Sequence, residues 1–264
     1  MINKDTSFKF LKVVGVIAIV FLIAFTTQKT FGLFWVAQTG AGELGWQSMA
    51  MSSDGTRIAA IGYDDEDAVG LYTSDDSGVT WTLRTTSENP EWNSVASSAD
   101  GLKLAATTQS GGYIYTSADA GATWTERTTS GQRSWLSIAS SGDGTKLLSG
   151  AVNDYAYLST DSGATWTAIT SLGTLYYWSS FEISTNGSVL TLQAQETEGE
   201  MHFFVSTDGG TTWTDRNGSG ARKWKVSATS ADGTKLVAAV SGFTSSPVPG
   251  YIYTSSNAGV TWVK

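Results

Sequence analysis

The chain has 264 residues, a formal net charge of −8 and a pI near 4.6, and only 15% of its residues are charged. This acidic balance argues against nucleic-acid binding, because proteins that bind phosphates normally present a basic surface. The chain has no cysteine, so disulfides and thiolate metal sites are excluded. Its 29 glycines and 11 tryptophans suit tight turns between strands with half-buried aromatic faces.

The N-terminal segment carries lysines followed by an uninterrupted apolar run at residues 13–25. A basic flank and about a dozen apolar residues are typical of a secretory signal, whereas a transmembrane helix usually needs roughly 20. We expect residues 1–30 to form one hydrophobic helix, either a signal peptide or an uncleaved membrane anchor. The segment predicts that residues 31–264 lie outside the cytoplasm, secreted or attached to the membrane through this helix.

A first motif begins with tryptophan, ends nine positions later in glycine, and occurs five times. The copies are residues 46–55, 92–101, 135–144, 178–187 and 224–233. In each copy the glycine follows Asp or Asn, and small apolar residues alternate with polar ones before it. Alternation of this kind indicates a strand, and Asp-Gly or Asn-Gly is a strong signal for a hairpin turn. The motif therefore predicts five hairpins.

A second motif follows each hairpin and reads Ser-x-Asp-x-Gly-x-Thr-Trp, with Asn in place of Asp in the last copy. Its Asp or Asn and Trp positions are Asp76 and Trp81, Asp119 and Trp124, Asp161 and Trp166, Asp208 and Trp213, and Asn257 and Trp262. The carboxylate can accept hydrogen bonds from its own turn, and the glycine permits a left-handed backbone. We expect the tryptophan to insert between neighbouring sheets and bury a large apolar surface. These are structural features first.

The second motif resembles the Asp-box, or bacterial neuraminidase repeat, of sialidase-like β-propellers. The resemblance covers about residues 31–264. It implies an all-β fold, a β-propeller of about five four-stranded blades preceded by the N-terminal helix. It also implies that each box lies between the third and fourth strands of a blade, away from the ligand face. Propellers with this box include assembly factors and sorting receptors that hydrolyse nothing, so the resemblance does not by itself assign a function.

Residues 31–38 resemble an isolated fourth strand ahead of the first blade, because Trp35 precedes Trp46 by the spacing that separates Trp124 from Trp135. Such a strand can close a propeller ring by joining the last blade. The last blade already begins a fourth strand of its own near the C-terminus. We expect five blades with overlapping closure, and the alternative is that the chain is a piece of a longer propeller.

The connections between the second and third strands, and between blades, differ most among the repeats. Variable loops on a rigid scaffold are where recognition tends to occur, and tyrosines offer flat amphipathic contact surfaces. We expect a protein or glycan partner to bind this face near the central channel, with no cofactor or metal. The candidate ligand-binding residues are Tyr63, Asp65, Glu66, Arg133, Tyr155, Tyr176, Tyr177 and Arg222.

Catalysis is the competing hypothesis. In the sialidases that the second motif resembles, three arginines hold a carboxylate. Only Arg133 and Arg222 of the six arginines in this chain fall on the loop face. A single histidine, His202, excludes multi-histidine metal sites. We predict a protein without catalytic residues. The alternatives are a sialidase-like glycoside hydrolase that uses carboxylates of the acidic loops at residues 64–67 and 196–200, and a purely architectural or assembly module.

Overall fold

The computed structural model describes residues 37–64, 69–84, 90–174, 177–196, 201–216, 224–240 and 250–264. All of the described strands belong to one compact unit, Gln38–Lys264. The expected N-terminal helix at residues 1–30, and Trp35 with its expected closing strand, lie outside the described residues. Within those ranges, no helix has the length and apolar character needed to cross a membrane.

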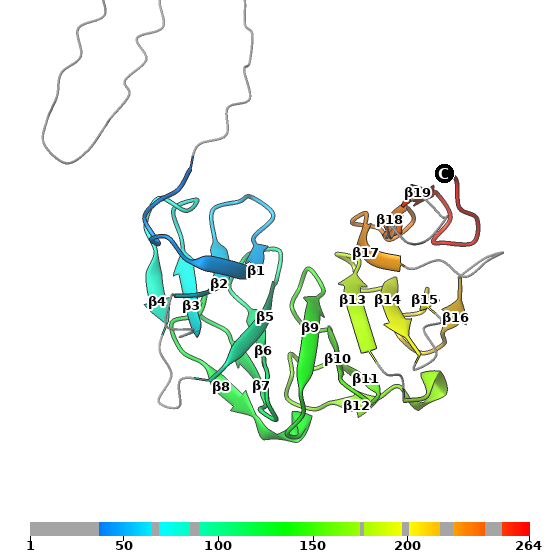
Figure 1. Cartoon of the computed structure of the whole chain (residues 1–264), viewed down its shortest axis with the longest axis horizontal. Helices are drawn as coiled ribbons and strands as arrows, with labels where there is room; N and C mark the ends of the chain where they lie inside the picture. The colour runs from blue at the N-terminus through cyan, green and yellow to red at the C-terminus, as the bar shows by residue number, and fades with distance from the viewer. Residues whose placement is uncertain are drawn as a thin grey trace, which may run out of the picture. The chain divides into compact units, whose positions relative to one another are not determined.

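The described part of the chain folds into five antiparallel sheets that follow one another in chain order (Figure 1). The first three sheets are β1 (Gly45–Met51), β2 (Ile58–Tyr63), β3 (Val69–Ser74) and β4 (Thr82–Arg84); β5 (Trp92–Ser97), β6 (Leu104–Thr108), β7 (Ile114–Ser117) and β8 (Thr125–Arg127); and β9 (Trp135–Ser140), β10 (Leu147–Ala151), β11 (Ala156–Ser159) and β12 (Thr167–Ala168). The last two are β13 (Tyr177–Ile183), β14 (Leu190–Gln195), β15 (Met201–Ser206) and β16 (Thr214–Asp215); and β17 (Trp224–Thr229), β18 (Leu236–Val240) and β19 (Ile252–Ser255).

The fifth sheet differs from the expected four-stranded blade. It has three strands, and the place of the fourth is taken by a single bridge between Thr254 and Val263. Short 3-10 helices follow β8 and β12, at Thr128–Ser130 and Thr170–Leu172. The all-β expectation and the five Asp-Gly or Asn-Gly hairpins are confirmed in the described residues.

Both turns of each sheet lie at the same end. In all five sheets, a backbone N–H of the box hairpin donates to a carbonyl next to the first turn, as Ala120 does to Leu102 at 2.9 Å. The other four bonds join Ser77 to Thr56, Ser162 to Thr145, Gly209 to Ser188 and Ala258 to Thr234. The loops between second and third strands, and the connections between sheets, must therefore lie at the opposite end. We call the two ends the turn end and the loop end.

Successive sheets pack on each other through two different faces. The tryptophan face carries the tryptophan of the first strand and that of the box, and the rear face is the opposite one. The rear face of the first sheet, with Ile61 and Leu71, packs against Trp92, Val95 and Leu104 on the tryptophan face of the second. Three further clusters repeat this arrangement down the chain. The core is thus a series of junctions between successive sheets.

The deepest tryptophans belong to the first strands. Trp92, Trp135, Trp178 and Trp224 are each at most 1% exposed, whereas the box tryptophans are only partly buried. The box ring packs on the first-strand ring of its own sheet, and the centroids of Trp92 and Trp124 lie 5.4 Å apart. The expected insertion of the box tryptophan is confirmed for Trp124, Trp166, Trp213 and Trp262, which all pack against the clusters between sheets. The sequence did not reveal that the first-strand indole fills each junction more deeply and that the box indole covers it.

The box carboxylate organises its own hairpin as expected. The Oδ1 atom of Asp119 accepts from the Ser117 hydroxyl at 2.7 Å and from the Thr123 amide at 2.8 Å, and Oδ2 accepts from the Thr123 hydroxyl at 2.6 Å. The hydroxyl and amide of Thr123 hold the pKa of Asp119 at about 2. Gly121 has a φ of 84°, in the left-handed region that favours glycine. Asp76, Asp161 and Asp208 accept the same three bonds.

A basic side chain just after the first turn of a sheet donates a hydrogen bond to the next sheet at the turn end. Arg57 Nη1 donates to the Asp100 carbonyl oxygen at 2.7 Å. In the next two sheets, Lys103 and Lys146 donate their Nζ atoms to turn carbonyls of the following sheet, at 2.9 and 2.8 Å. These bonds confirm that Arg57 lies at the end opposite to the variable loops.

Candidate functional site

A hollow of about 580 Å³ opens at the loop end, where the first strands of four sheets begin. Its wall is built from β1, β5, β9 and β13, with contributions from the loops that follow β6 and β10. Uncharged polar side chains dominate the wall, and Tyr177 and Leu136 add apolar surface. The polar members are Gln47, Ser48, Asn93, Ser94, Gln109, Ser110, Ser134, Ser137 and Ser179.

Hydrogen bonds join the walls of the hollow from sheet to sheet. Gln47 Nε2 donates to Asn93 Oδ1 at 2.6 Å, and Asn93 Nδ2 donates to the Trp135 carbonyl at 2.8 Å. Ser48 Oγ accepts from the Val95 amide of the next sheet at 3.1 Å. These contacts fix the spacing of the innermost strands. They also hold donors and acceptors in place around the opening, which is what orientation of a ligand requires.

Two polar residues at the start of β13 stand out in this region. The Ser179 hydroxyl is buried and has no hydrogen-bond partner among the described residues. Tyr177 begins β13, is 42% exposed and lines the hollow. A tyrosine in such a position presents an apolar ring and a hydroxyl to the same ligand.

Of the four sequence-predicted ligand residues that the structure describes, Tyr177 lines this hollow. Tyr63 ends β2 and is 44% exposed, and Tyr155 is partly buried against the cluster between the second and third sheets. Tyr63 and Tyr155 thus do not line the hollow with Tyr177. The other candidates Asp65, Glu66, Tyr176 and Arg222 lie outside the described residues.

Arg133 is engaged in the scaffold of the third sheet. Its Nε donates to Asp154 Oδ2 at 2.8 Å, and its guanidinium lies 4.4 Å from the centroid of the Tyr157 ring. The Asp154 backbone carbonyl accepts from Trp178 Nε1 of the fourth sheet at 3.0 Å. Burial raises the pKa of the Tyr157 hydroxyl. The predicted ligand residue Arg133 thus contacts Asp154 and Tyr157 of its own sheet at the loop end.

His202 lies on β15 as expected of a strand residue, and two carboxylates flank it. Its Nδ1 is 2.7 Å from Asp215 Oδ2, and its Nε2 is 3.2 Å from Glu196 Oε1. The imidazole stacks on Phe204 with the ring planes 12° apart. Among the described residues, no group of three or more His, Asp or Glu side chains is arranged to hold a metal.

The junction between the fourth and fifth sheets contains buried polar groups that sequence reasoning missed. Thr191 and Gln193 on β14 are at most 1% exposed, and the Thr191 hydroxyl and both Gln193 amide atoms have no partner among the described residues. Glu182 pairs with Thr191 across the strands and shares this face. Burial raises the pKa of Glu182 to about 7. The sequence signal was the alternation Leu-Thr-Leu-Gln at residues 190–193, which places two polar residues on one face of the strand and two leucines on the other.

The lining of the hollow also escaped the sequence analysis, although a signal was present. In four of the five first strands, a serine follows the tryptophan by two positions. These serines are Ser48, Ser94, Ser137 and Ser180. A residue type repeated at one register position marks a common environment, which here is the inner edge of the sheets.

Comparison with known proteins agrees with this architecture. The BNR/Asp-box repeat family matches residues 204–215, the box of the fourth sheet. No curated protein sequence matches the chain. The GH74 enzyme of Niastella koreensis is similar in structure, with a TM-score of 0.66 and 17% identity over 83% of this chain and 38% of that one.

Two further structures show the same likeness. The GH74 xyloglucanase of Xanthomonas campestris has a TM-score of 0.65 and 14% identity, over 83% of this chain and 38% of that one. YCF48 bound to D1 peptide has a TM-score of 0.57 and 18% identity, over 84% of this chain and 68% of that one. The chain therefore spans well under half of the two GH74 structures. At these identities the likeness shows the fold, a β-propeller, in which the fourth sheet carries the matched BNR/Asp-box repeat.

Proposed function

We propose that the protein is a non-catalytic, extracytoplasmic β-propeller that binds a protein or glycan partner at the hollow of its loop end. The observation that carries the proposal is the hollow itself, in which four sheets present hydroxyl and amide groups around Tyr177. Such groups pair with the peptide groups of an extended chain or with sugar hydroxyls. Export through residues 1–30 belongs to the same proposal.

The polar groups at the two ends differ in their hydrogen bonding, and this difference supports a site at the loop end. At the turn end, the Asp-box groups are occupied by bonds within the hairpins, and the cations are bonded to the next sheet. At the loop end, the connections vary in length and the hollow is open. YCF48, a protein of similar fold, binds D1 peptide, which is a precedent for a peptide partner.

Glycoside hydrolysis is the second candidate, and the likeness to the GH74 enzymes favours it. Hydrolysis of a glycosidic bond generally needs two carboxyl groups on either side of the bond. The described lining of the hollow consists of uncharged residues. Carboxylates from Asp65 or Glu198, which lie outside the described residues, would have to supply this chemistry. Turnover of xyloglucan or of fluorogenic glycosides, abolished by Asp65→Ala or Glu198→Ala, would establish the hydrolase instead.

The binding proposal is tested with the full-length chain on a glycan array and in a pull-down from membranes. Against the ligand that either screen recovers, Tyr177→Ala should weaken binding by about tenfold or more, as expected for an aromatic anchor. Val79→Ala is the matched control, because Val79 is 64% exposed in the box hairpin at the turn end. Equal loss in both variants would place the site elsewhere. No binding in either screen would favour the architectural module.

A further inference from the structure

The first sheet exposes the surface that every later sheet buries. Trp46 is 41% exposed, whereas the equivalent tryptophans of the four later sheets are at most 1% exposed. Met49 occupies the same register position as Val95, and the two are 70% and 4% exposed. Trp46 and Trp81 still pack on each other, with ring centroids 6.0 Å apart. Within the described part of the chain, the tryptophan face of the first sheet is thus formed but has no neighbouring sheet packed on it.

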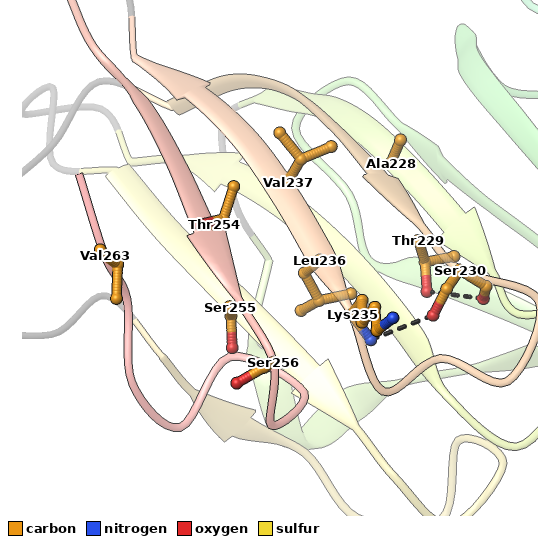
Figure 2. A pocket seen from close by; sticks show the side chains of 10 residues that line it. All are labelled: Ala228, Thr229, Ser230, Lys235, Leu236, Val237, Thr254, Ser255, Ser256 and Val263. Carbon is orange, nitrogen blue, oxygen red and sulfur yellow. Dashed lines mark hydrogen bonds between the residues drawn. The ribbon is translucent and has the colours of Figure 1, made fainter.

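The fifth sheet exposes the complementary surface. Ile252 on its rear face is 65% exposed, whereas its register equivalents Leu71, Ile114 and Phe203 are fully buried. Val237 is 39% exposed. A groove of about 500 Å³ runs over this face, and Figure 2 shows Val237, Thr254 and Val263 along it.

A second observation concerns Lys235, which also lines this groove (Figure 2). It follows Asp232 by three positions, as Lys103 follows Asp100 and Lys146 follows Asp143. The two earlier lysines donate to a turn carbonyl of the next sheet. Lys235 is exposed at the same place, with no next sheet following it in the described chain. Lys103 donates to the carbonyl of the first-turn aspartate, Asp143, in the next sheet. In the first sheet the aspartate at that position is Asp54, so its carbonyl oxygen is the matching acceptor for Lys235.

We propose that the rear face of the fifth sheet binds the tryptophan face of the first sheet of a second copy of this chain. The two exposed faces are the two halves of a junction that the chain makes four times internally. Soluble proteins rarely leave large apolar patches uncovered, and repeat units need a neighbour to bury their faces. The contact is heterologous, because it joins two different surfaces. Lys235 sets its register by donating to the Asp54 carbonyl of the other copy.

Disulfide cross-linking tests the junction directly, because the chain has no cysteine of its own. Met49→Cys and Ile252→Cys are made in separate full-length preparations, mixed in mild detergent and oxidised. Their equivalents Val95 and Leu71 belong to one packed cluster, so the two thiols should meet. The control pairs Ile252→Cys with Ala122→Cys, which is exposed on the box hairpin of the second sheet. Association through residues 1–30 would affect both pairs equally.

The junction predicts a mixed disulfide dimer at least tenfold more abundant than the control dimer. Adding Lys235→Ala to the Ile252→Cys chain should lower that yield severalfold, and Lys235→Arg should restore it. A yield no higher than the control, same-residue dimers in excess, or no effect of Lys235→Ala would overturn the proposal. A chain carrying both cysteines that forms its disulfide at monomer mass would also overturn it, because its own first and fifth sheets would then be in contact.

Discussion

At the scale of the residue, the Asp-box is a set of hydrogen bonds that a neutral amide can also make. Asn257 Oδ1 accepts from the Thr261 amide at 2.9 Å and from the Ser255 hydroxyl at 3.0 Å. Its Nδ2 donates to the Thr261 hydroxyl at 3.0 Å, where the other boxes have an acceptor. Because the threonine hydroxyl both donates and accepts, the hairpin tolerates the exchange.

This comparison predicts the outcome of substitutions at Asp119. Asp119→Asn should change the free energy of unfolding by no more than about 0.5 kcal/mol, since the amide replaces each contact. Asp119→Ala removes three accepted hydrogen bonds and should cost roughly 1–2 kcal/mol. Denaturant unfolding of the two variants measures both values. Equal destabilisation by Asn and Ala would show that the negative charge itself matters.

Glu182 makes the stability of the protein depend on pH. Burial raises its pKa from 4.5 to about 7, so the folded state keeps a proton that the unfolded chain releases. The free energy of unfolding should therefore fall as the pH rises from about 4.5 to about 7, by up to about 3 kcal/mol, and stay lower above that. Glu182→Gln should remove this decline and be more stable than the wild type at pH 8. The exposed Glu43→Gln serves as the control, and a parallel decline in both variants would contradict the assignment.

At the scale of the element, the two tryptophans of a sheet should contribute unequally. Trp135 is 1% exposed within the junction, and Trp166 packs against it from a half-buried position, with ring centroids 6.1 Å apart. Trp135→Ala should cost roughly 3–5 kcal/mol, the range for a fully buried aromatic side chain. Trp166→Ala should cost about half of that or less, because it removes less buried area. Urea denaturation separates the two, and a larger loss at Trp166 would reverse the assigned roles.

Hairpins and turns could be predicted from the sequence because their signals are local. The Asp-Gly turns and the box glycines each require a particular backbone conformation, and repetition at a fixed spacing fixed their order. Burial could not be predicted in the same way. Trp92 and Trp124 are the same residue type, and only the packing of successive sheets decides which of them is enclosed. The predicted fourth strand of the last sheet was also not found among the described residues, where a single bridge takes its place.

At the scale of the whole molecule, the sequence predicted the end of the protein at which the hollow opens better than the residues that line it. Variable loops pointed to the loop end, and Tyr177 does line the hollow there. Arg133 was chosen for its charge and its loop position, and its partner Asp154 lies 21 positions away in the sequence. The hollow itself is formed by side chains such as Ser94 and Asn93, which reach Ser48 and the Trp135 carbonyl of the neighbouring sheets only after folding.

The central claim is that a partner binds at the loop end while the turn end holds the blades together. Hydrogen–deuterium exchange of the full-length chain, with and without the partner recovered on it, tests this claim most directly. We expect binding to slow exchange at residues 134–137 and 177–179, which line the hollow. Exchange in the box hairpin at residues 117–124 should not change. Protection confined to the box hairpins, with the hollow unaffected, would contradict the account.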